Sequence, residues 1–231
     1  MEPAGCRIRA GQQRWIMSRF ITFEGIEGSG KSTQVARASE LLTARGVPHL
    51  RTREPGGTPL GDAIRRILLH PEHDAMSPRA ELLLVHAARA QHLEAVVRPA
   101  LAAGKVVLCD RFEDSTRAYQ GYGRGIPEEV IAALSELTAE GLRPDRTFLL
   151  DLDVEEGLER ARSRNAQPGD PACEEGRIDS EAIEFHRRVR AGYLDLARRH
   201  PDRFHVLDGA EPAERIAERI AGELLRFLDL D

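Results

Sequence analysis

The sequence has few of the residues that mark disulfide-rich, zinc-binding or membrane proteins. Its three cysteines, Cys6, Cys109 and Cys173, are an odd number without C-x-x-C spacing, which indicates neither a disulfide framework nor a zinc site. No apolar run approaches the length of a membrane span. These absences favour a protein of the reducing cytoplasm without a membrane partner.

Charge and length narrow the class of protein further. The net charge of −5 argues against non-specific binding to nucleic acid, so we expect no nucleic-acid partner. The 231 residues are 41% apolar, which suits one α/β domain or two small ones. Residues 1–17 lack the apolar stretch of a signal peptide. We expect them to be a disordered arm or a mis-assigned start, followed by a folded domain over residues 18–231.

Residues 25–32 read GIEGSGKS, a full match to the phosphate-loop pattern G-x-x-x-x-G-K-[ST]. An apolar stretch precedes it and a helix-forming stretch follows it, as the motif requires. The glycines let backbone N–H groups surround phosphate oxygens, Lys31 reaches the β- and γ-phosphates, and the Ser32 hydroxyl binds Mg²⁺. We therefore expect a nucleoside triphosphate to bind at Gly25, Ile26, Glu27, Gly28, Ser29, Gly30, Lys31, Ser32 and Thr33.

Strand and helix patterns alternate along the chain. Short, nearly continuous apolar runs predict buried parallel strands, and apolar residues at a spacing of three to four predict helices between them. The strands are expected at 20–23, 48–52, 105–110, 146–151 and 204–208, and the helices at 31–45, 59–69, 78–103, 127–140, 154–164, 179–199 and 211–228. Pro99 is expected to kink or shorten its helix. The pattern predicts a doubly wound five-stranded parallel sheet with helices on both faces.

Charged residues follow the predicted strands at the edge where a parallel sheet binds ligands. Asp110 ends an apolar strand, as a Walker-B acid that holds Mg²⁺ does; the alternative is a helix N-cap. Arg111 faces the ligand crevice, where an arginine is costly unless it meets an anion. Arg53, at the same rim, is a phosphate ligand or a solvated surface residue. Glu24 ends the first strand and is either a Mg²⁺ or ribose ligand or a helix-capping acid.

Three arginines, Arg160, Arg162 and Arg164, lie at the end of a predicted helix. An irregular, proline- and glycine-rich stretch follows, and Arg177 comes after it. We expect residues 160–178 to form a short lid whose arginines stabilise the charge on a transferred phosphoryl group. A solvated charged helix is the alternative.

Four segments together resemble the thymidylate kinase family, in the family's order and across nearly the whole chain from residue 19. They are FEGIEGSGKST at 23–33, TREPGGT at 52–58, DRFEDS at 110–115 and AYQG at 118–121. The resemblance implies phosphorylation of dTMP by ATP with Mg²⁺, in a homodimer packed through helices such as 78–103. The absence of a basic residue between Gly25 and Gly30 resembles the bacterial branch, in which the lid supplies the arginines.

The resemblance also implies roles for the remaining site residues. Arg53 and Arg111 would hold the dTMP phosphate, with Asp110 near the metal. Arg89, which spacing alone leaves as a pocket residue or a surface residue, would reach the thymine carbonyl. The rest of the implied acceptor site is Ser115 and Thr116 at the base edge, Tyr119 against the deoxyribose and Gln120 close by.

One departure from the family pattern concerns the thymine site. The family commonly has a Phe four residues before the base-reading arginine, and here that position is Val85, with His86 beside it. Val85 would give an apolar contact, or His86 would take over the stacking. A kinase for another nucleoside monophosphate or for a deoxynucleoside is the alternative function. A GTP-dependent switch would need an N-K-x-D string, which the sequence lacks.

Overall fold

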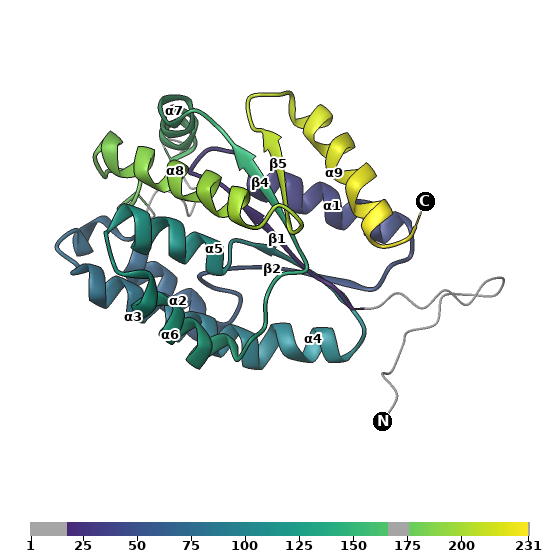
Figure 1. Ribbon diagram of the computed structural model, residues 1–231, viewed down its shortest axis with the longest axis horizontal. Coiled ribbons are helices and arrows are strands. Elements are labelled where there is room, and N and C mark those ends of the chain that lie inside the picture. Colours follow the sequence, from purple (N-terminus) through teal and green to yellow (C-terminus); the bar gives the residue numbers. More distant parts are fainter. Residues whose placement is uncertain (1–17, 166–175, 231) are drawn as a thin grey trace.

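A five-stranded parallel sheet forms the centre of the computed structural model (Figure 1). The structure describes residues 18–165 and 176–230, so the predicted N-terminal arm over residues 1–17 lies outside the described residues. The strand order is β2-β3-β1-β4-β5, and every neighbouring pair is parallel. The strands are β1 Phe20–Glu24, β2 His49–Arg53, β3 Val106–Asp110, β4 Arg146–Asp151 and β5 Phe204–Asp208.

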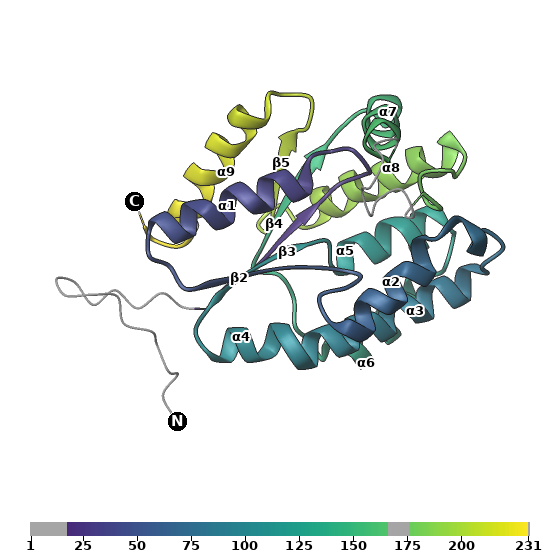
Figure 2. The same cartoon turned by 180° about the vertical axis from the view of Figure 1, so that it is seen from behind.

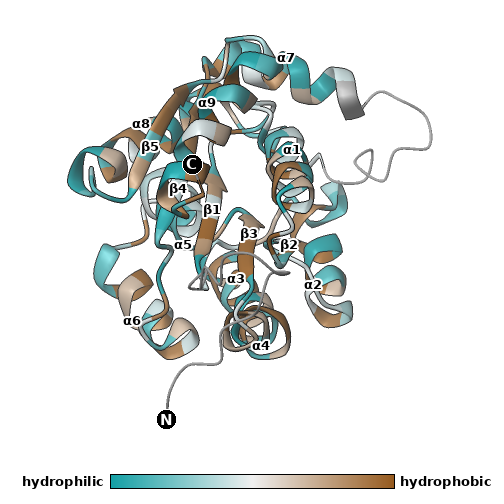
Figure 3. Cartoon of the chain, turned by 90° about the vertical axis from the view of Figure 1, so that its right-hand side faces the viewer, coloured by the Kyte–Doolittle hydropathy of each residue, from teal (hydrophilic) through white to brown (hydrophobic). Residues whose placement is uncertain are grey.

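The three inner strands are buried along almost their whole length because helices cover both of their faces. β1 is buried at every position, and in β3 and β4 only residues at the strand ends are partly accessible. On β3, Val106 and Leu108 pack in the core beneath α1 and α9, while Val107 and Cys109 pack in a second core on the opposite face. The apolar strands in Figure 3 therefore form one layer between two layers of helix.

The helices follow the strands in alternation and pack on both faces (Figures 1 and 2). They are α1 Lys31–Ala44, α2 Pro59–Leu69, α3 Pro78–His92, α4 Arg98–Ala102, α5 Glu113–Thr116, α6 Glu128–Ala139, α7 Val154–Asn165, α8 Ile183–Arg199 and α9 Ala213–Phe227. A 3-10 turn, η1, covers Pro71–His73, and two π-helical segments, η2 and η3, cover Leu93–Val97 and Arg117–Gly123. None of the helices in the described parts of the chain combines the length and apolar character that a membrane span requires.

The predicted fold class is confirmed, and the differences have local causes. The helix expected over 78–103 is divided into α3, η2 and α4, because Pro99 lacks the N–H that would continue the α-helical pattern and a wider turn precedes it. The helix expected from residue 179 begins at Ile183. Helix α5 and the π-helical segment η3 were not predicted.

Parallel pairing brings the carboxyl ends of neighbouring strands to one edge of the sheet. Asp110 pairs with Phe23 on one side and with Arg53 on the other. The loop after β1 and the residues that end β2 and β3 therefore meet at the same edge, where an open parallel sheet binds its ligands.

Candidate active site

The glycine loop between β1 and α1 has the backbone shape that a phosphate cradle needs. Gly25, Gly28 and Gly30 have φ values of 143°, 70° and 89°. A Cβ atom on Gly28 would lie 2.1 Å from the Gly157 carbonyl oxygen, so a larger residue does not fit there. Gly30 immediately precedes α1, and the loop therefore ends at a helix N-terminus, where backbone N–H groups and the helix dipole favour an anion.

Lys31, the first residue of α1, folds back on this loop. Its Nζ donates to the Ile26 carbonyl oxygen at 2.7 Å and to Ser29 Oγ at 3.2 Å. Burial, and then the charge of Arg111, lowers the pKa of Lys31 to about 7. A nearby phosphate would favour the charged amine again, so this side chain is poised to bind an anion.

Ser32 and Asp110 form the second feature of the loop. Ser32 Oγ donates to Asp110 Oδ2 at 2.6 Å, and the two residues come from the start of α1 and the end of β3. Hydroxyl and carboxylate oxygens are the ligands that Mg²⁺ prefers, and Mg²⁺ sites of this kind use one or two protein oxygens plus substrate phosphates. The pair therefore fits a nucleotide-bound Mg²⁺. No group of three or more metal-binding side chains occurs in the part of the chain that the structure describes.

A cavity of about 210 Å³ opens beside the loop. It brings together most of the predicted site, namely Glu27, Gly28, Lys31, Ser32, Arg53, Val85, Arg89, Asp110, Arg111, Ser115, Thr116, Tyr119 and Gln120. Val85 lines this cavity, whereas His86 is buried away from it and its Nδ1 lies 3.0 Å from Thr138 Oγ1 on α6. The position next to Arg89 thus presents an aliphatic side chain to a ligand.

Arg111 is held in a defined orientation at the centre of the cavity. Its φ of 70° is uncommon for a residue with a Cβ atom. Its guanidinium donates to the Gly25 carbonyl oxygen at 2.9 Å, to Tyr193 Oη at 3.1 Å and to Glu27 Oε1 at 3.2 Å, and it lies over the Tyr119 ring. These contacts fix the group in place before any ligand binds.

Arg89 is almost fully buried, at 1% exposure, yet lines the same cavity. Its Nε donates to Glu54 Oε2 and its Nη2 to Thr116 Oγ1, both at 2.8 Å, while Nη1 is buried without a hydrogen-bond partner. Burial opposes ionisation of Glu54, but the charges of Arg89 and His92 outweigh it and lower the pKa of this carboxyl. The Arg89 guanidinium therefore keeps a free donor that suits an acceptor on a ligand.

Glu24 is not among the residues that line the cavity, which disfavours a contact with Mg²⁺ or ribose and favours the other predicted role, a helix-capping acid at the start of α5. It is fully buried behind the cavity wall and accepts from the Phe112 N–H at 2.7 Å, Ser115 Oγ at 2.6 Å and Tyr193 Oη at 3.0 Å. Burial, and then the charge of Asp114, raises the pKa of Glu24 to about 7. Its position suits a residue that orients the wall rather than one that touches a nucleotide.

The carboxylate that does face the cavity is Glu27. Its Oε1 accepts from Arg111 and from the Tyr119 hydroxyl, and its Oε2 lies 3.4 Å from His186 Nδ1 without hydrogen-bond geometry. Burial opposes its ionisation, but His186, Arg111 and Lys31 together hold the pKa of Glu27 well below its usual range. Glu27 is therefore a carboxylate held at the cavity by Arg111.

The prediction that Arg177 belongs to a mobile lid is wrong. It is 1% exposed, and its guanidinium donates to Glu81 Oε2 at 2.6 Å and to the Leu68 carbonyl oxygen. Gln120 Nε2 donates to the same glutamate, to Oε1, at 2.8 Å. Arg177 is thus part of the fixed wall of the cavity, and the local sequence gave no signal of this long-range pair.

The other lid arginines lie at or near the end of α7. Arg160 Nη1 donates to the Gly209 carbonyl oxygen at 3.1 Å, beyond β5, and its Nη2 pairs with Glu156. Arg162 is exposed. The side chain of Arg164 lies outside the described residues, as do residues 166–175 of the predicted lid. The lid stays a prediction.

Several residues in and around the cavity wall were not predicted, among them Glu54 and Glu81, which line it, and Tyr193, which does not line it but contacts Arg111. Tyr193 on α8 contacts both Arg111 and Glu24, but it comes from a helix with no recognisable motif. Glu54 directly follows Arg53 in the TREPGGT segment, and a buried carboxylate beside a proline turn could have been proposed from that segment.

The fold and the site define a P-loop nucleotide kinase. A sequence model of the family described as thymidylate kinase matches residues 23–220. The thymidylate kinases of Syntrophotalea carbinolica and Desulfovibrio desulfuricans are each 53% identical to this chain, over 88% and 90% of it and over 94% and 96% of their own lengths. That of Pelobacter propionicus is 51% identical over 91% of this chain and 95% of its own length. The chain belongs to the thymidylate kinase family.

Proposed function

We propose that this protein transfers the γ-phosphoryl group of ATP to dTMP, giving dTDP and ADP. The observation that carries the proposal is the convergence of Arg53, Arg89 and Arg111 on one cavity beside the phosphate loop. A phosphoryl acceptor that is itself anionic needs such cations, and the unpartnered Nη1 of Arg89 suits a base carbonyl. Family membership supports dTMP as the acceptor.

The proposed mechanism needs positioning and charge stabilisation rather than a general base. The attacking oxygen belongs to the dTMP phosphate and is already anionic, so no proton has to be removed. Arg111 and Arg53 would aim this phosphate, while Lys31 and the backbone of the loop would hold the β- and γ-phosphates of ATP. Mg²⁺ held by Ser32 and Asp110 would offset charge on the triphosphate when bound. Tyr119 would pack against the deoxyribose, with Gln120 close by.

Residues 18–231 would act as one nucleoside monophosphate kinase domain, with a lid over about 160–178 in which Arg177 belongs to the fixed wall of the cavity. Arg160, Arg162 and Arg164 would supply charge to the transferred group from that lid. The hydrogen bond from Arg160 to Gly209 joins α7 to the loop after β5, and we propose this loop as the place where adenine binds. We expect the enzyme to work in the cytoplasm, where both nucleotides are available.

A homodimer is part of the proposal. Helix α3 packs against both α2 and α6, which lie together on one side of the molecule in Figure 2. These helices carry five exposed large apolar side chains, Leu60, Ile67, Leu83, Val130 and Leu137. An apolar group of this kind supports burial against a second copy of the chain.

A panel of acceptors tests the proposed reaction. ADP formation is measured with ATP, Mg²⁺ and one of dTMP, dUMP, dCMP, AMP, GMP or thymidine, and we expect the highest kcat/KM with dTMP. Turnover with AMP or thymidine but none with dTMP would contradict the proposal. The variant Lys31→Ala is the control for a contaminating kinase, because it should lose activity with every acceptor.

A further inference from the structure

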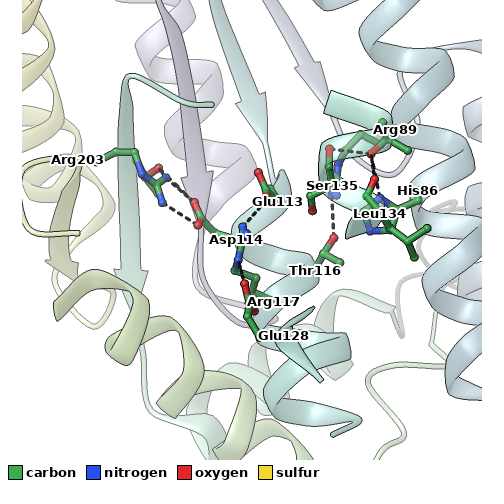
Figure 4. Close-up of polar contacts among 12 residues, drawn as sticks. His86, Arg89, Glu113, Asp114, Thr116, Arg117, Glu128, Leu134, Ser135 and Arg203 are labelled. Atoms are coloured by element: carbon green, nitrogen blue, oxygen red, sulfur yellow. Dashed lines mark hydrogen bonds and ion pairs between the residues drawn. The ribbon is translucent and has the colours of Figure 1, made fainter. Parts of the chain in front are cut away.

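Helix α5, Glu113–Thr116, is the first turn of a helical stretch that continues without a break into η3, and its side chains contact both Arg89 and Arg111. η3 packs against α8, while the side chain of the N-cap residue Phe112 makes no capping hydrogen bond. The position of this first turn therefore depends on contacts of its own side chains as well as on η3. Figure 4 shows that its side chains point to different partners.

Two of these contacts orient the arginines. Thr116 Oγ1 accepts from Arg89 Nη2 at 2.8 Å. Ser115 Oγ accepts from Arg111 Nη1 at 3.2 Å and donates to Glu24 at 2.6 Å. A shift of α5 would therefore move partners of both guanidinium groups at once.

The third contact holds α5 itself. Arg203, immediately before β5, binds Asp114 with both terminal nitrogens, Nη1 to Oδ2 at 2.6 Å and Nη2 to Oδ1 at 2.8 Å (Figure 4). Arg203 Nη1 also donates to Thr147 Oγ1 on β4 at 2.6 Å. The Asp114 side chain is 3% exposed and that of Arg203 is 21% exposed. This bidentate geometry is strong and directional, and it attaches α5 to the rigid sheet.

We infer that Asp114 and Arg203 are positioning residues for the acceptor nucleotide: by fixing α5 they hold Arg111 and Arg89 in the geometry that binds and aims it. Neither residue lines the cavity, so they act through Ser115 and Thr116, and the charge of Asp114 also acts on Glu24. The inference rests on the proposed function, because it assigns the acceptor to these arginines. The donor is held by the backbone of the phosphate loop and by Lys31, although Arg111 also donates to Gly25 and Glu27 of that loop.

Steady-state kinetics of Asp114→Asn and Arg203→Met test the inference. We expect KM for dTMP to rise about tenfold and kcat to fall, because small displacements of positioning groups are costly. KM for ATP should stay within about twofold of wild type, since the donor is held elsewhere. Arg203→Lys keeps the charge but loses the bidentate geometry, and it should restore part of the loss.

Glu223→Gln is the matched control. Glu223 on α9 pairs with Arg146, at the start of β4, at 3.4 Å, and its side chain is 14% exposed, but it does not contact α5. We expect it to keep the wild-type KM for both nucleotides. Thermal unfolding of each variant identifies a temperature at which all are folded, and the kinetics are compared there.

Two results would overturn the inference. One is a wild-type KM for dTMP and a wild-type kcat in both folded variants. The other is an equal rise in KM for ATP and for dTMP, which would indicate general loosening. If the wild-type enzyme does not use dTMP, the proposed function fails by itself, and the same comparison is made with the acceptor that the panel identifies.

Discussion

Ser32 Oγ lies 2.6 Å from Asp110 Oδ2, although 78 residues separate the two in the sequence. The parallel pairing of β1 with β3 produces this contact, because it places the end of β3 beside the loop that follows β1. The pair gives the phosphate loop a hydroxyl and a carboxylate on one side of the expected triphosphate. The first prediction depends on this arrangement.

Asp110→Asn should lower kcat by on the order of a hundredfold and raise the Mg²⁺ concentration needed for half-maximal rate, because one charged ligand is lost. The rate is measured over a range of Mg²⁺ at saturating ATP. Asp151→Asn is the control, since Asp151 also ends a strand of the sheet but pairs with Arg190 at 2.7 Å. An unchanged Mg²⁺ dependence in Asp110→Asn would show that this residue does not hold the metal.

Binding of Mg-ATP should take up about one proton at pH 8, because triphosphate restores the charge that burial takes from Lys31. The pKa of Lys31 in the free protein is about 7, so the amine is largely neutral at pH 8. Calorimetry in two buffers of different ionisation enthalpy measures the uptake. Lys31→Arg should bind the nucleotide without uptake, because arginine stays protonated. Identical heats in both buffers for the wild type would refute the prediction.

Deprotonation of Glu24 should lower the free energy of unfolding as the pH rises towards neutrality. The pKa of Glu24 is about 7 in the folded protein, whereas the ordinary value for a glutamate is 4.5. The folded state therefore binds the proton more tightly. The stabilisation of the folded state by this proton is complete below pH 4.5 and is lost as the pH rises through 7. The loss in free energy of unfolding is at most about 3 kcal/mol. Urea unfolding at pH 4.5 to 8 should show this loss in the wild type relative to Glu24→Gln. Parallel curves for the two proteins would show that Glu24 does not titrate in this range.

The sequence predicted the features that depend on short segments. Apolar runs identified four of the five strands, β2 was predicted as a short strand that ends before the Pro-Gly-Gly turn, and the motif at residues 25–32 identified the phosphate loop, because all of these are local patterns. The sequence could not distinguish Glu24 from Glu27 as the carboxylate that faces the ligand. Both flank the loop, and only the position of Tyr193 on α8 shows that Glu24 is enclosed.

The features of the site that were not predicted from the sequence share one physical cause. Arg177 reads as a lid cation because it follows an irregular segment, but its charge is neutralised by Glu81, 96 residues away in the sequence. The π-helical segment η3 that continues α5 departs from the 3.6-residue period, and the partner of Asp114, Arg203, lies 89 residues away in the sequence. Contacts of this range are set by the sheet topology, which periodicity does not specify.

Val85→Phe should strengthen acceptor binding. Val85 lines the cavity next to Arg89, and an aromatic ring there could stack on a base, which is worth about 0.5–1.5 kcal/mol beyond area burial. KM for dTMP should fall by about two- to tenfold, with KM for ATP unchanged. Val206→Phe is the control, because Val206 on β5 is 43% exposed and does not line the cavity. A rise in KM for dTMP would show that the cavity has no room for the ring.

Arg160→Ala and Arg162→Ala should each lower kcat at least about tenfold while raising KM for dTMP much less, because the lid arginines are proposed to stabilise charge that develops during transfer. Initial rates at saturating ATP, with dTMP varied, separate the two parameters. Arg187→Ala is the control, since Arg187 on α8 is also exposed and pairs with Glu155 on α7, yet has no proposed contact with nucleotide. An unchanged kcat in both lid variants would show that Arg160 and Arg162 belong to a solvated charged helix face and do not act in catalysis. In that case Lys31, Arg53 and Arg111 would have to stabilise the transferred group.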